Sequence, residues 1–239
     1  MVPTVKSARS PNARQSEPPP HWEDRSASRV LETGRDQILE RSRRIVDAAY
    51  ELLEEQGLDG LTIRAVLKKT GLSRRAFYER FEGKDDLVLA VFEHTIRRAA
   101  NHLDELVRAT TEPLERLRVI VTSIVFGSIT LAGPQAAQSN RRGAALSREH
   151  LRLAESRPAD LQTALSPLLA LITQHLSDGM EAGVIRSDDP RRMAALVYNL
   201  VSTTVHTELL AQESARPDRA QRARLAADIW EFCRRAIAA

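Results

Sequence analysis

The chain has 239 residues, enough for one large domain or two ordinary ones with a core that folds without disulfide or metal staples. Its 42% hydrophobic and 28% charged residues are usual for a globular protein, whereas 4% aromatic residues and 10 glycines are few and favour helices. The single cysteine, Cys233, excludes a disulfide scaffold and gives no reason to expect an oxidising compartment. No run of roughly 20 apolar residues and no signal peptide occur, so we expect a cytoplasmic protein without a membrane partner.

Residues 1–34 are predicted to form a disordered tail. They hold five prolines, five serines and few apolar side chains, too few to offset the entropy of ordering the segment. Basic residues of such an arm can enter a DNA minor groove. Acidic residues of the same segment nearly cancel them, which favours the alternative of a solvated tail.

A helical period begins at about Arg35 and continues to Gly57, a residue suited to a left-handed stop. A second helix follows, with Thr62 as its N-cap and Gly71 as its end. Leu61 and Val66 flank this start at the two positions of a hydrophobic staple.

The same capping pattern recurs directly after the second helix. Ser73 is the expected cap of a third, short helix that ends near Phe81, with Leu72 and Phe77 as its staple. Two capped helices separated by a few residues form a helix-turn-helix. Residues 35–83 are therefore predicted to be a three-helix domain of this kind.

The remaining residues, 84–239, predict more helices and neither a sheet nor a nucleotide-binding loop. A connecting helix spans 84–108, and further periods cover 113–131, 159–182, 190–212 and 217–238, whereas 133–156 is ill defined. Pro167 must kink its helix or begin a new one capped by Ser166. The expected fold class is all-α.

Positive charge is concentrated at the second and third predicted helices. Residues 60–84 contain seven basic and two acidic residues, an excess of five in a chain whose net charge is +3. On a helix, Phe77 faces the core while Arg74, Arg75 and Tyr78 lie on the exposed side. Arginine can donate two bonds to a guanine edge, and a tyrosine hydroxyl can hold a phosphate. The pattern favours a helix in the DNA major groove over its alternative, a solvated charged face.

Several short motifs carry a resemblance to a known family. They are Ile45–Ala49, Leu61–Arg64, Thr70–Ser73, Phe77-Tyr78, Phe81 and Lys84. Over about residues 38–98 the chain resembles the N-terminal DNA-binding domain of TetR-type transcriptional regulators. The resemblance implies a homodimer on double-stranded operator DNA, with an effector-binding and dimerisation domain after the helix-turn-helix. It also implies repression that a small-molecule effector relieves.

The resemblance further implies which side chains contact DNA. Phosphates would be held by Thr62, Arg64, Tyr78 and Lys84. Bases would be read from the set Arg74, Arg75, Ala76, Glu79 and Arg80. Ser73 joins the same candidate interface as the cap of the recognition helix.

Two more sets of candidates lie in the C-terminal half. The broad apolar faces of the last two predicted helices suggest a four-helix interface between two copies, with an internal core as the alternative. The interface candidates are Val197, Leu200, Val201, Val205, Ile229 and Cys233. The ligand-binding candidates are Phe126, His175, Tyr198 and His206, although each alone is more often a core or surface residue.

No catalytic set, metal-binding pattern or cofactor motif is found. His94 and His102 lie eight residues apart without a cysteine or a close carboxylate pattern. We therefore predict a sequence-specific transcriptional regulator rather than an enzyme. The alternatives are a constitutive DNA-binding protein without an effector and a helical carrier of a small molecule or lipid.

Overall fold

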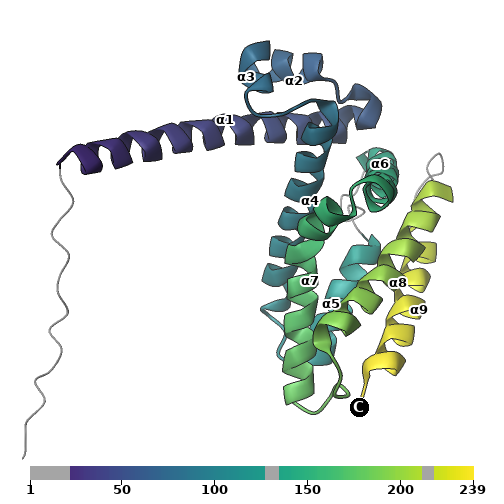
Figure 1. Ribbon diagram of the computed structural model, residues 1–239. Coiled ribbons are helices and arrows are strands. Elements are labelled where there is room, and N and C mark those ends of the chain that lie inside the picture. Colours follow the sequence, from purple (N-terminus) through teal and green to yellow (C-terminus); the bar gives the residue numbers. More distant parts are fainter. Residues whose placement is uncertain (1–21, 127–134, 212–217) are drawn as a thin grey trace, which may run out of the picture. The chain divides into compact units, whose positions relative to one another are not determined.

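The computed structural model describes residues 22–126, 135–211 and 218–239, which fall into two units that meet at Arg41/Ser42 and are described separately. The helices are α1 (Trp22–Gly60), α2 (Ile63–Thr70), α3 (Arg74–Tyr78), α4 (Lys84–Val107), α5 (Pro113–Phe126), α6 (Gln135–Ser156), α7 (Pro158–Glu181), α8 (Pro190–Ala211) and α9 (Arg219–Ile237) (Figure 1). Within these ranges there is no strand, only an isolated bridge between Ile185 and Ala238. None of the described helices is both long and apolar enough to span a bilayer. The all-α prediction is confirmed.

The first unit contains the beginning of α1. Residues 1–21 of the predicted tail lie outside the described residues, but residues 22–34 are helical, so the expectation of disorder is wrong for them. The helix starts at Trp22 rather than near Arg35. The last proline of the segment is Pro20, and nothing after it removes a backbone donor that a helix needs.

The ends of the first helices follow the predicted capping residues. The helical geometry of α1 breaks at Gly57, where φ is 71°. The side-chain oxygen of Thr62 accepts a hydrogen bond of 3.1 Å from the backbone N–H of Ala65, and α2 ends at Gly71 in the left-handed conformation. Ser73 caps α3 in the same way, also at 3.1 Å.

A small apolar core joins α1, α2, α3 and the start of α4. Its fully buried members are Ile45, Ala49, Leu61, Val66, Phe77 and Leu87. Phe81 also enters this core, with its ring centroid 5.5 Å from that of Phe77. However, α3 ends at Tyr78, earlier than predicted, and the chain reaches Phe81 through a turn. Ala145 of α6 belongs to the same core, so the C-terminal half contacts the helix-turn-helix.

The helices from α4 onward form the larger core. α7 packs against α4, α5 and α8, while α5 packs against α9 and α6 against α8 (Figure 1). α7 continues through Pro167, and the Ser166 hydroxyl donates to the Thr163 carbonyl at 2.8 Å instead of capping a new helix. The predicted helix ends at residues 131 and 212, and the start at Pro217, lie outside the described residues.

α6 is a helix that the sequence pattern did not reveal. The segment 133–156 was expected to be ill defined, but residues 135–156 are helical. Its buried positions include Ala144, Ala145, Ser147, Glu149 and Leu153. Small and polar side chains on a buried face produce no apolar period, because packing against α7 and α8 rather than side-chain hydrophobicity determines their burial.

Candidate functional site

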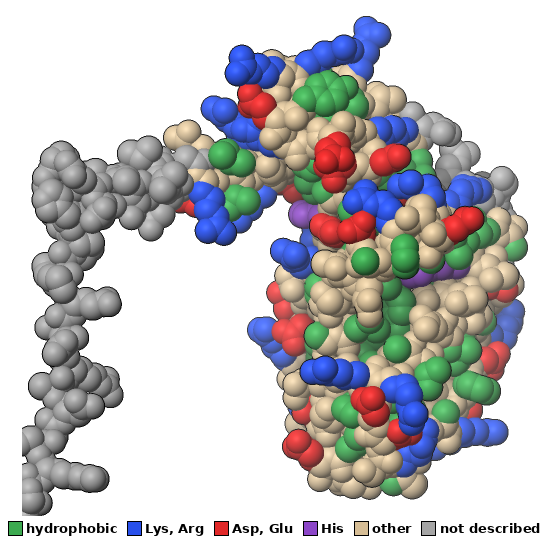
Figure 2. Space-filling model, viewed as in Figure 1, with side chains coloured by type: hydrophobic (Ala, Val, Ile, Leu, Met, Phe, Trp, Pro, Cys, Tyr) green, Lys and Arg blue, Asp and Glu red, His purple; other side chains and the backbone are tan. Residues whose placement is uncertain are grey.

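The candidate DNA-binding surface lies on α2, α3 and the first turn of α4. Tyr78 is 55% exposed, although its neighbour Phe77 is 0% exposed. Arg74 and Arg75 are exposed at the start of α3, and the side chain of Arg75 is 89% exposed. Figure 2 shows Lys and Arg side chains gathered over α2 and α3. This short helix therefore presents two cations and one phenol to solvent.

The side chain of Arg75 forms a hydrogen bond with Glu79, four residues further along the chain. The Nε atom of Arg75 donates to Oε1 of Glu79 at 3.0 Å, across one turn from α3 to its C-cap. This hydrogen bond lowers the pKa of Glu79, which keeps the carboxyl ionised. Because the bond uses only Nε, the two Nη groups of Arg75 can donate together to a planar acceptor.

Arg80 does not share this surface. Its side chain is only 6% exposed, and its Nη1 donates to the backbone carbonyl of Ala76 and lies 3.3 Å from Glu79. The expected access of Arg80 to bases is therefore wrong. The cause is the early end of α3 at Tyr78, which places residue 80 in the following turn and directs its side chain back onto the helix.

The other DNA-binding candidates lie at the starts of α2, α3 and α4 and within α3. Thr62 and Arg64 are exposed at the start of α2, and Ser73 is exposed before α3, while Ala76 is half-buried. Lys84 begins α4, is exposed, and donates from Nζ to the carbonyl of Leu58 at 3.4 Å. Eight of the ten predicted residues are thus exposed, whereas Ala76 is half-buried and the side chain of Arg80 is buried.

Two contacts that the sequence did not indicate fasten α2 to α1. Lys69 lies 2.9 Å from both Glu51 and Glu55, and these hydrogen bonds raise the pKa of Lys69. Arg44 donates to the carbonyl of Thr70 at 3.1 Å, at the C-terminal end of α2. These cations are used within the protein, so not every basic residue of the region serves a ligand.

Two predicted ligand residues meet in the C-terminal half. Tyr198 and His206 of α8 both lie beside His150 of α6, with ring centroids 6.2 Å and 4.6 Å from it. Phe92 of α4 is 6.1 Å from the same ring. Burial lowers the pKa of His206 to about 4 and also lowers that of His150, so both imidazoles are neutral at pH 7. The sequence missed His150 because its helix was not recognised.

The other two ligand candidates have different surroundings. His175 of α7 is buried, and its Nδ1 lies 3.6 Å from Oδ2 of Asp178, which is also 3.6 Å from Nη1 of Arg116. Burial lowers the pKa of His175. Phe126 ends α5 and is partly buried against the large core. In the described ranges, no group of three or more His, Cys, Asp or Glu side chains is placed to hold a metal ion.

Five of the six predicted interface residues are buried within the chain itself. They are Val197, Val201, Val205, Ile229 and Cys233, whereas Leu200 is partly buried against the same core. The interface assignment is therefore wrong for these five, and the internal core is the correct alternative. The apolar faces of α8 and α9 that carry these residues pack against neighbouring helices of the same chain. Leu196 of α8 and Phe232 of α9 point outward instead and are 63% and 64% exposed.

Two parts of the chain match known protein families. Residues 45–91 match the family described as bacterial regulatory proteins, tetR family. Residues 146–236 match the C-terminal domain of AefR-like transcriptional repressors. The first match covers the end of α1, the two capped helices and the start of α4, and the second covers the second half of α6, all of α7 and α8, and α9 up to residue 236.

Individual relatives agree with these matches. The HTH-type transcriptional regulator BetI of Brucella anthropi is 30% identical over 81 residues, which is 34% of this chain and 42% of BetI, less than half its length. The fatty acid metabolism regulator protein of Bacillus subtilis is 21% identical over 167 residues, 68% of this chain and 80% of the relative. The structure of FadR from Bacillus subtilis in complex with stearoyl-CoA has a similar fold, with a TM-score of 0.60 and 17% identity, covering 80% of this chain and 96% of FadR.

Proposed function

Because the chain belongs to the TetR family of bacterial transcriptional regulators, we propose that it binds operator DNA and represses transcription until a small molecule releases it. The exposed set Arg74, Arg75 and Tyr78, on a helix capped at Ser73, carries this proposal. Residues 35–83 would be the DNA-binding domain and 84–239 the effector-binding and dimerisation domain, acting in the cytoplasm.

The proposed recognition uses the geometry of α3. The major groove admits a helix, and an arginine with two free donors pairs with O6 and N7 of guanine. Arg75, oriented through its Nε by Glu79, has this form. Glu79 can accept from N4 of a cytosine, and Arg74 can contact a neighbouring base. Tyr78 and Lys84 would hold the phosphates on either side, aided by Thr62 and Arg64 at the start of α2.

We propose a homodimer as the DNA-binding form. Two recognition helices related by a two-fold axis fit half-sites roughly 34–36 Å apart along the duplex. Leu196 on α8 and Phe232 on α9 are large apolar side chains exposed on the two helices that the sequence suggested for dimerisation. Leu196 and Phe232, rather than the buried residues that the sequence suggested, are therefore the proposed contact with a second copy.

The effector would act through α4 and α6. α4 has 24 residues and is about 36 Å long, so a small tilt at its far end moves Lys84 by several ångström. α6 carries His150 beside α8 and also contributes Ala145 to the helix-turn-helix core. Its Arg152 lies 3.9 Å from Asp85 in the first turn of α4. A ligand that shifts α6 therefore changes the support of the recognition helix.

Selection of genomic DNA fragments by the purified protein tests the proposal. The selected site is then titrated with Arg74→Ala, Arg75→Ala and Lys84→Ala. Each α3 arginine change is expected to cost about 1–3 kcal/mol and to relax the preference at one position per half-site, whereas Lys84→Ala weakens all sequences alike and flattens the salt dependence. Arg191→Ala, at an exposed position of α8, is the control. Unchanged base preference after both α3 changes would refute this recognition mode.

A further inference from the structure

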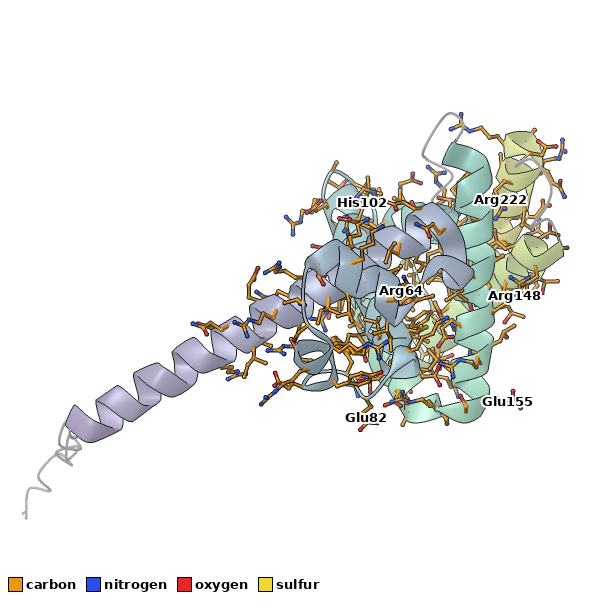
Figure 3. All side chains as sticks on the ribbon, turned by 90° about the horizontal axis from the view of Figure 1, so that it is seen from above. Arg64, Glu82, His102, Arg148, Glu155 and Arg222 are labelled. Carbon is orange, nitrogen blue, oxygen red and sulfur yellow. The ribbon has the colours of Figure 1, made fainter. Side chains whose placement is uncertain are left out.

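Arg222 of α9 is a buried cation without a carboxylate partner among the described residues. The residue is 5% exposed, and its Nη1 donates to the carbonyl of Val125 in the last turn of α5 at 3.4 Å. Its Nη2 is buried and has no hydrogen-bond partner within the part of the chain that the structure describes. Arg222 is labelled on α9 in Figure 3, seen from above. The guanidinium thus keeps a donor that nothing in the described protein uses.

The surroundings of Arg222 make this unused donor energetically unfavourable. Burial lowers the pKa of Arg222, against the opposing effect of the charge of Glu208 on α8. A guanidinium remains charged in proteins, so the charge is desolvated without full compensation. Such costly groups are retained where function needs them.

Arg116 shows how the same fold satisfies an arginine whose role is structural. Its Nε donates to the carbonyl of Thr110 at 2.6 Å, and its Nη1 lies 3.6 Å from Asp178. Arg116 therefore has a backbone acceptor and a carboxylate, whereas Arg222 has one long bond to a carbonyl.

Arg222 lies on the buried face of α9. Ala226, Ile229 and Cys233 follow it at helical intervals and are all buried. On α5, Val121 and Val125 are buried in the same core. The charge therefore faces apolar side chains of two packed helices rather than solvent.

We propose that Arg222 binds the anionic group of the effector, a carboxylate or a phosphate, while the apolar side chains of α5 and α9 contact an apolar body. The assignment rests on the proposed function, since it names the chemical class of the molecule that releases the protein from DNA. An anion at Nη2 supplies the missing acceptor and neutralises the buried charge.

The first test needs no ligand. Arg222→Met keeps a long side chain and removes the unpaired charge, so the melting temperature is expected to rise by about 2–4 °C. Arg116→Met removes a satisfied arginine and is the matched control, with a lower melting temperature. A fall for Arg222→Met as large as that for Arg116→Met would show that Arg222 is structural and would overturn the proposal.

The second test compares three probes with one apolar chain. Octanoate, octyl phosphate and octanol are titrated by calorimetry into the full-length protein and into Arg222→Gln. The anionic probe that fits is expected to bind about tenfold more tightly than octanol, and Arg222→Gln is expected to lose that preference. The octanoate and octyl phosphate arms distinguish the two kinds of anion. Equal binding of octanol, equal binding to Arg222→Gln, or no binding of any probe would overturn the assignment.

A DNA titration separates this proposal from the function on which it rests. Without a probe, the wild-type protein and Arg222→Gln are expected to bind the selected operator with equal affinity. If the wild-type protein selects no DNA, the proposed function fails whatever the probes do. If both proteins bind DNA equally and the probes do not distinguish them, only the role of Arg222 fails.

Discussion

The helix-turn-helix and the C-terminal helices place their candidate functional groups in opposite surroundings. On α3 the side chain of Arg75 is 89% exposed, whereas Arg222 in α9 is 5% exposed. Exposed charges are solvated and contribute little to folding, but buried ones change stability whenever they are altered. Mutations of the exposed α3 side chains should therefore change DNA binding with little effect on stability, whereas mutations of buried side chains in the C-terminal half should change stability without removing a DNA contact.

The largest expected effect comes from a charge placed in the large core. Ile229→Asp puts an unpaired carboxylate at a position that is 6% exposed, and we expect the free energy of unfolding, measured with urea, to fall by about 4–5 kcal/mol.

Phe232→Asp changes an exposed position three residues along the same helix. This side chain is 64% exposed, so the variant should keep its helix content but convert the proposed dimer to a monomer in sedimentation. If Phe232→Asp remains dimeric, the interface lies elsewhere.

The second effect contrasts two adjacent residues of α3. Phe77→Ala removes a fully buried ring, and the expected cost is about 3–5 kcal/mol in unfolding. Tyr78→Ala changes an exposed side chain and should alter stability by less than about 0.5 kcal/mol. Its expected effect is a roughly tenfold loss of operator affinity, through a lost bond to phosphate. A stable Phe77→Ala protein would contradict the assigned core.

The two regions also differ in how much their sequence revealed. Thr62, Gly71 and Ser73 act through local bonds within a few residues, so their roles were predictable, and each is observed. Arg80 was misplaced because the end of α3 depends on tertiary packing of Phe77 and Phe81. Local signals give a helix start more reliably than the point where a short helix stops.

In the C-terminal half, burial depends on which helix packs against which. An apolar helix face such as that of Val201 on α8 or Ile229 on α9 gives the same sequence pattern whether it packs within its own chain or against a second copy. In the structure both residues are buried within the chain. α6 was missed because Ala144 and Ser147 on its buried face have no strong apolar signature. Arg222 was missed because charged residues are usually exposed, although its spacing relative to Ile229 matched the buried stripe.

The third expected effect is a pH dependence of folding stability that arises from His206 in the C-terminal half. The pKa of His206 is about 4 in the folded chain against an ordinary value of 6.5, because the ring is buried beside His150. Between these values the unfolded chain binds a proton that the folded chain rejects, so stability falls as the pH is lowered from 6.5 towards 4.

Replacing His206 should weaken this dependence. His206→Gln is expected to reduce the stability lost across that window by about 1–2 kcal/mol, allowing for the partial exposure of the ring. Urea unfolding at neutral and mildly acidic pH measures the difference. His150 is the titratable group beside the His206 ring and in turn lies beside Tyr198, and the double change of both histidines tests their coupling. An identical slope for wild type and His206→Gln would refute the role of this side chain.

The smallest effect tests whether the cap of α3 serves stability and DNA binding separately. Ser73→Ala removes the acceptor of the Ala76 N–H and should cost about 1 kcal/mol. Ser166→Ala is the control, since that exposed hydroxyl lies within α7 and caps nothing, and a change below about 0.5 kcal/mol is expected.

Two further substitutions at the same position complete the comparison. Ser73→Asn and Ser73→Asp should both restore the stability lost in Ser73→Ala, because either side chain can accept the capping bond and a carboxylate also suits the helix N-terminus. Only Asn should restore operator affinity, since an added negative charge at the exposed start of α3 would face DNA phosphates. Affinity and unfolding are measured on the same three variants. If Asp binds the operator as tightly as Asn, the start of α3 does not face DNA.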